Sequence, residues 1–239
     1  MGFLDFFSGK PTDSAILAQV QKAKERYAQP DYRRMAMDKL LKWDTEASLA
    51  GLLQRLTVVV QSPQWDEEEK LWVVEQMVSR GERALPILQK FIAEHNEVNH
   101  ALMALKKIVD NSDIYSQYLL SALKHRLASD HRSVQAKQEI IAALTELNRH
   151  DFDEILAPYL YDHSDEVQCL VIDSLAESPH DKIKQDLISL LSSETHSARV
   201  LRRVASILAQ QKISITPDTK LAEAVREEFS IKNGVLSRA

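Results

Sequence analysis

Apolar residues recur at intervals of three and four along almost the whole chain. One stripe contains Val167, Leu170, Val171 and Leu175, which is the spacing of an amphipathic helix with one buried face. No segment shows the strict alternation of a half-buried strand. The β-branched valines at 58–60 continue a helical stripe, and we expect them to form the last turn of that helix.

Capping and helix-breaking residues divide this pattern into segments of roughly 10 to 18 residues. These breakers are Pro30-Asp31, Asp44-Thr45, Ser62-Pro63, Gly81, Asn96, Asn111-Ser112-Asp113, Asp130, Asp151, Ser164-Asp165, Ser178-Pro179, Thr195 and Thr216-Pro217. Only 5 glycines and 7 prolines are present, fewer than an all-β fold with many tight turns requires. The sequence therefore predicts an all-α protein of about thirteen helices.

The predicted helices also repeat. Val134, Val167 and Val200 lie near the starts of three helices, at a regular spacing within the 20–50 residues typical of repeat proteins. Shorter helices are expected between them, at 155–161 and 183–191. The repeating unit is a helix pair, and a single pair cannot bury its apolar face without stacking on a neighbour. The sequence predicts an α-solenoid of about six pairs.

The segments HSDEVQCLVIDSLAE, DKIKQDLISLL and RGERALPILQKFI resemble HEAT repeats of the bacterial phycobilisome-lyase-like type. This resemblance implies a right-handed superhelix whose second helices line a concave face used for binding. The expected layout is an N-terminal apolar tail at 1–11, a capping helix at 12–30 and a single array at 31–239. The second helices are expected near 46–60, 82–94, 113–127, 152–161, 181–192 and 217–229.

Aromatic and cationic residues on these second helices are the candidate binding residues. They are Tyr115, Tyr118, Lys124, Tyr159 and Tyr161. Tyrosine combines a large apolar body with a polar tip, which suits the centre of an interface. With the resemblance, this predicts a non-catalytic scaffold or adaptor that binds another protein and has no cofactor.

Two enzyme classes are the alternatives. A bilin lyase or related chaperone-like factor would use Cys169, but that residue lies in an apolar stripe and reads as a small buried hydrophobe. A HEAT-like DNA alkylation-repair glycosylase would need a cationic groove. The net charge of −5 and the balance of acids and bases in both halves disfavour nucleic acid. Trp72 lies in an apolar stripe and is expected in the core.

The histidines and the clustered charged residues can be explained by their places in turns and on helix surfaces. His131, His163 and His196 recur in turns before the repeated helices, and stacked helices about 10 Å apart cannot share one metal ion. Basic pairs such as Arg33-Arg34 are expected on a solvated surface, with a patch for an acidic partner as the less favoured alternative. The acids at 66–69 are expected either to complement a helix dipole or to form an exposed ridge for a basic partner.

The first residues are unusually aromatic, with Phe3, Leu4, Phe6 and Phe7 ahead of a Ser-Gly-Lys-Pro joint. Such an apolar segment can dock on its own first repeat, on another protein or weakly on a membrane surface, and docking on protein is favoured. The start lacks the basic region of a secretory signal, and no run reaches the roughly 18 apolar residues of a membrane span. With one cysteine, the expected location is the reducing cytoplasm.

Overall fold

The computed structural model describes residues 10–216 and 219–239, and within them it is mostly helical, with thirteen α-helices and one two-stranded sheet. The expectation of a mainly helical protein is confirmed. The chain divides into two compact units, an N-terminal unit of residues 1–125 and a C-terminal unit of residues 126–239. The tail residues Phe3, Leu4, Phe6 and Phe7 lie outside the described residues.

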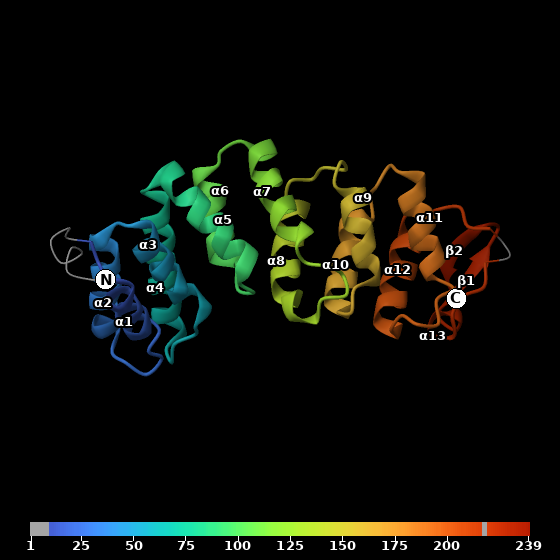
Figure 1. Ribbon diagram of the computed structural model, residues 1–239. Helices are drawn as coiled ribbons and strands as arrows, with labels where there is room; N and C mark the ends of the chain where they lie inside the picture. The colour runs from blue at the N-terminus through green and yellow to red at the C-terminus, as the bar shows by residue number, and fades with distance from the viewer. Residues whose placement is uncertain (1–9, 217–218) are drawn as a thin grey trace. The chain divides into compact units, whose positions relative to one another are not determined.

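From residue 10 onward, the N-terminal unit consists of seven α-helices and two short 3₁₀-helices in two layers (Figure 1). They are α1 (Asp13–Ala23), α2 (Pro30–Trp43), α3 (Glu46–Leu53), η2 (Gln54–Thr57), α4 (Pro63–Val78), η3 (Gly81–Ala84), α5 (Leu85–Glu94), α6 (Asn99–Ile108) and α7 (Ser112–Lys124). In one layer α1, α3, α5 and α7 pack each on the next, and in the other α4 packs between α2 and α6.

The predicted breakers act as helix caps in this unit. Asp44 adopts a left-handed conformation (φ 46°) and ends α2, while the hydroxyl of Thr45 accepts a hydrogen bond from the Ser48 backbone N–H in a capping box at the start of α3. The Asn111 side chain likewise accepts from two backbone N–H groups at the start of α7. Local chemistry therefore sets these boundaries, as the sequence predicts.

Two expectations about this unit are wrong. The capping helix, expected to reach residue 30, ends at Ala23. The valines at 58–60 are not helical: Val58 is extended (φ −129°, ψ 151°), and the Val60 N–H donates to Oδ1 of Asp66 at 3.0 Å. A side-chain carboxylate that supplies the acceptor makes the extended path favourable for this β-branched segment.

The C-terminal unit also consists mainly of helices that pack on their neighbours, and it ends in two short strands (Figure 1). Its elements are η4 (His131–Ser133), α8 (Val134–Thr145), α9 (Asp153–Leu156), η5 (Ala157–Tyr161), α10 (Asp165–Leu175), α11 (Asp181–Leu190), α12 (Ala198–Gln210), α13 (Glu223–Arg226), β1 (Phe229–Lys232) and β2 (Val235–Arg238). Helix α10 packs between α8 and α12, with η5 against α10 and with α11 and α13 against α12.

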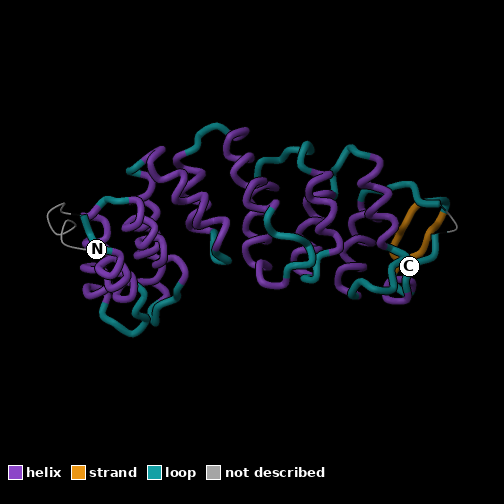
Figure 2. The backbone as a smooth tube through the Cα atoms, viewed as in Figure 1, coloured by secondary structure: helices purple, strands orange, loops and turns teal. Residues whose placement is uncertain are grey.

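The expected helix over 217–229 is wrong. Its described part holds only the four-residue α13, and the chain then forms an antiparallel hairpin of β1 and β2 (Figure 2). The two turn residues, Asn233 and Gly234, both have positive φ values, 53° and 73°, as a type I′ turn requires. Phe229 and Leu236 are buried, and β2 packs on α12, so the hairpin covers the apolar face that a final helix was expected to cover.

The repeated leucine of α10 offers a test of the packing. Leu175 is fully buried, and α10 lies between α8 and α12. We predict that Leu175→Ala lowers the free energy of unfolding by about 2–5 kcal/mol, because methyl groups are lost and a cavity remains. Urea titration followed by circular dichroism measures it, with exposed Lys182→Ala on α11 as the control. A loss below about 0.5 kcal/mol would contradict the packing described for α10.

Candidate functional site

Five charged side chains form a buried ion cluster where α2, η2 and α4 meet. Arg33 contacts Glu69 at 2.7 Å (Nη2 to Oε1), and Arg55 contacts Glu69 at 2.7 Å and Asp66 at 2.8 Å. Lys70 contacts the other oxygen of Asp66 at 2.7 Å. All five residues are buried, so the expectation of a solvated Arg33 is wrong. Asp66 lies in the first turn of α4, as expected for a carboxylate that complements the helix dipole, but Asp66 and Glu69 are buried and form no exposed ridge.

The buried ion cluster also fixes the backbone segments that join α2 and α4 to the layer of α1 and α3. Arg33 donates to the carbonyl oxygens of Ala28 and Glu25 in the turn between α1 and α2, and Arg55 donates to the carbonyl of Val58 after η2. Burial by itself would raise the pKa of Asp66, but hydrogen bonds from Lys70, Arg55 and the Val60 N–H outweigh it and hold that pKa below its usual range. The cluster thereby holds the turn before α2 and the segment that follows η2.

The lowered pKa of Asp66 makes stability depend on pH. Because its folded-state pKa lies below the unfolded value of about 3.9, the carboxylate stabilises the fold above that value, and the contribution is lost as the pH falls through the folded-state pKa. We predict that Asp66→Asn costs about 1–3 kcal/mol at pH 7, and that the difference from wild type shrinks below about pH 4. Urea unfolding at several pH values measures both.

The control for this prediction is Asp38→Asn, which removes an exposed ion pair between Asp38 and Arg34. We expect it to cost less than about 0.5 kcal/mol. A cost of Asp66→Asn that is the same at pH 7 and pH 3 would contradict the role assigned to this carboxylate.

Two hollows lie side by side on the layer of α1, α3 and α5. The first, of about 660 Å³, lies between α1 and α3, and the second, of about 520 Å³, lies between α3 and α5. Both are lined by Ala47 and Gln54, so they form one surface, which we call the α1–α3–α5 groove. Its apolar lining is Ile16, Leu17, Val20, Ala47, Ala50, Gly51, Leu53, Ile87 and Phe91.

Small residues on α3 create this groove. Helix α1 packs so closely on Gly51 that a Cβ atom there would lie 2.9 Å from Cγ2 of Val20. Ala47 and Ala50 also have small side chains, so the surface of α3 leaves hollows toward α1 on one side and toward α5 on the other. At the α5 end, the His95 ring stacks on Phe91 with centroids 4.1 Å apart, and its Nε2 lies 3.1 Å from Nε2 of Gln54.

Two of the predicted binding residues belong to the core instead. Tyr115 on α7 is 3% exposed and Tyr159 is 7% exposed, so neither can anchor a partner in this fold. The Tyr159 hydroxyl donates to the carbonyl of Arg126 at 2.8 Å, and burial, with the charge of Asp162, raises its pKa to about 12. Both side chains are buried because they lie on the apolar stripes of their segments, a signal that was present in the sequence.

The other three predicted residues are accessible. Tyr118 is half-buried and lines a hollow of about 110 Å³ between α5 and α7. Lys124 is exposed at the end of α7. Tyr161, which belongs to the C-terminal unit, is 57% exposed, and its ring meets His196 edge-on at 5.4 Å.

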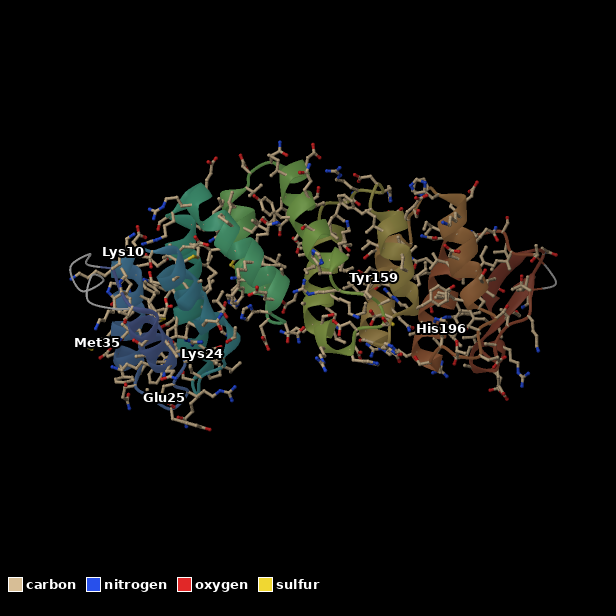
Figure 3. All side chains as sticks on the ribbon, viewed as in Figure 1. Lys10, Lys24, Glu25, Met35, Tyr159 and His196 are labelled. Carbon is tan, nitrogen blue, oxygen red and sulfur yellow. The ribbon has the colours of Figure 1, made fainter. Side chains whose placement is uncertain are left out.

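The histidines at the turns pack on their neighbours. His131 and His163 stack with ring centroids 3.8 Å apart. His196, labelled with Tyr159 in Figure 3, has Nδ1 2.6 Å from the Ser193 hydroxyl. In the part of the chain that the structure describes, no group of three or more metal-ligating side chains comes together.

Trp72 and Cys169 are less buried than the sequence suggests. Trp72 is half-exposed, and the guanidinium of Arg34 lies 3.9 Å from its ring centre. Cys169 is half-buried. Burial is the main factor that raises the pKa of its thiol, since the nearby charges of Arg199 and Arg203 oppose those of Asp173 and Asp165.

The raised pKa predicts a slow thiol. Only the thiolate is nucleophilic, so at pH 7.5 we expect iodoacetamide to modify Cys169 more slowly than an unstructured cysteine peptide with a pKa of about 8.5. Mass spectrometry over time measures the rate, and the same protein in urea, where the thiol is exposed, should react at the rate of the peptide. A native rate equal to or above that of the peptide would contradict the environment described.

Two further observations bear on function. Within the described residues, no helix is both long and apolar enough to cross a membrane. Comparison of the sequence with protein-family models and with curated proteins finds no match. Function is therefore inferred from the geometry of the surface.

Proposed function

We propose that the protein is a non-catalytic scaffold that binds another protein on the α1–α3–α5 groove. The observation that carries the proposal is this open, apolar groove, built from three successive helices of one layer. An exposed apolar surface costs solvation free energy unless a partner covers it, so such surfaces mark interaction sites. Tyr118 extends the same layer to α7.

The packing within each unit supports a HEAT-like array as the architecture. In the N-terminal unit every helix of one layer packs on the next helix of that layer, and in the C-terminal unit α8, α10 and α12 do the same. This nearest-neighbour packing is what a right-handed α-solenoid of stacked helix pairs requires. In such an array α3, α5 and α7 correspond to the second helices, the layer expected to bind, and α1 corresponds to the expected capping helix that packs on α3.

The lining of the groove favours binding over catalysis. Among the described residues its one imidazole, His95, has Nε2 near Gln54 and Nδ1 3.0 Å from the Phe91 carbonyl. A bilin-lyase-like enzyme would depend on Cys169, whose raised pKa leaves little thiolate at neutral pH. A DNA glycosylase would need a cationic groove, whereas acids outnumber bases in this lining. The free thiol also suits a cytoplasmic protein.

The test is affinity capture with a blocked groove. Ala47 is exposed and lines both hollows, so Ala47→Trp fills the groove without entering the core. We expect full-length wild type to capture at least one protein from extracts of the source cell. Ala47→Trp should capture about tenfold less of that protein, because losing one buried anchor at an interface weakens binding at least about tenfold. Quantitative mass spectrometry measures the ratio.

The matched control is Glu75→Ala, an exposed position of α4 in the other layer, which should capture the same proteins as wild type. Tyr118→Ala and Tyr161→Ala test the two accessible tyrosines as further anchors. If all of these variants capture what wild type captures, the surface assignment is wrong.

A further inference from the structure

The rim of the α1–α3–α5 groove is acidic. Four exposed carboxylates line it, those of Asp13, Glu25, Glu46 and Glu94, against two lysines, Lys24 and Lys90. Lys24 and Glu25 follow the last turn of α1 at one end of the groove (Figure 3). Among the described residues, none of the four carboxylates forms an ion pair.

Some carboxylates elsewhere in the N-terminal unit are paired within the chain. Asp44 binds Arg80 and Arg83 at 2.8 and 3.1 Å, and Glu67 lies 3.3 Å from His100. At the groove rim, carboxylates that are left to solvent surround an apolar floor. Such an arrangement is electrostatically complementary to a cationic partner.

The floor of the groove sets the shape of that partner. Leu17, on the groove side of α1, is 56% exposed, and Val20 is half-buried, while Leu53 and Ile87 line the hollow from buried positions. The described part of the groove is built from helices, whose backbone N–H and C=O groups are already paired, so it offers no strand edge for an extended peptide. A furrow between packed helices instead accepts the side-chain ridge of another helix.

From the acidic rim and the apolar floor together, we infer that the α1–α3–α5 groove binds an amphipathic helical segment of a partner protein, with apolar residues on one face and lysine or arginine flanking them. This inference rests on the proposed function and specifies its partner. The apolar face replaces water on the floor between α1, α3 and α5, and the flanking cations meet the carboxylates of Asp13, Glu25, Glu46 and Glu94.

The experiment titrates full-length protein into two fluorescently labelled helical peptides of about 14 residues, four helical turns. One has leucine on one face and lysine elsewhere, and the other has glutamate in place of every lysine. Fluorescence anisotropy measures binding. We expect the lysine peptide to bind wild type at least about tenfold more tightly than the glutamate peptide.

Variants locate the binding. Glu46→Gln/Glu94→Lys removes rim charge from α3 and α5, and we expect it to weaken the lysine peptide about tenfold, while Glu75→Lys on α4 leaves its affinity within about twofold. Ala47→Trp should weaken it as well by filling the floor. Circular dichroism shows whether each variant is folded. If the double variant does not fold, Ala47→Trp, which changes an exposed position, still tests the groove.

Two outcomes contradict the inference in different ways. If both peptides bind wild type equally and Ala47→Trp weakens both, the groove is a binding surface, the proposed function stands, and the cationic partner is wrong. If Ala47→Trp and the double variant both bind the lysine peptide as wild type does, the groove is not the binding surface and the proposed function fails with the inference.

Discussion

The ion pairs of Arg33 and Arg55 with Glu69 and Asp66 hold the N-terminal unit together. Isolated charges at these buried positions would cost several kcal/mol each to desolvate, so the side chains must meet in one arrangement. That arrangement brings α2, the end of η2 and the first turns of α4 to one point. It also holds the turn before α2 and the extended segment after η2 through backbone carbonyls. The groove on the opposite layer depends on it, because the cluster anchors the chain directly after α1 and directly after η2, which continues α3.

The C-terminal unit uses the same device on a smaller scale. Lys137 of α8 and Asp162 are both fully buried and form an ion pair, and the lysine also donates to the carbonyls of Leu127 and Asp130. The Asp162 side chain in turn accepts from the Ser164 N–H, at the start of α10. A charge inside α8 thereby fixes the loop before α8 and the turn between η5 and α10. In both units, a buried cation ties a helix to irregular segments that apolar packing alone would leave poorly specified.

The sequence predicts the helices well because their signals are local. Asp44, Ser62, Asn111 and Ser164 end or begin helices through their own side chains or backbone conformation. The buried ion cluster could not be foreseen, since Arg33 and Glu69 lie far apart in the chain and read as surface charges until the fold joins them. The hairpin had a local signal, the turn dipeptide Asn233-Gly234, but the prediction gave more weight to the helical periodicity of the preceding residues. The groove had none, because it arises from the close approach of α1 to Gly51 and from the short side chains beside it.

The two layers of the N-terminal unit therefore have different roles. In one layer, α2 and α4 contribute charged side chains to the buried ion cluster, while the layer of α1, α3 and α5 presents an apolar floor between exposed carboxylates. The most direct test of this division is photo-cross-linking of full-length protein with a benzophenone-labelled leucine–lysine helical peptide, followed by digestion and mass spectrometry. The account predicts cross-links within 13–25, 46–54 and 87–95. Cross-links concentrated on α2, α4 and α6, or in the C-terminal unit, would contradict it.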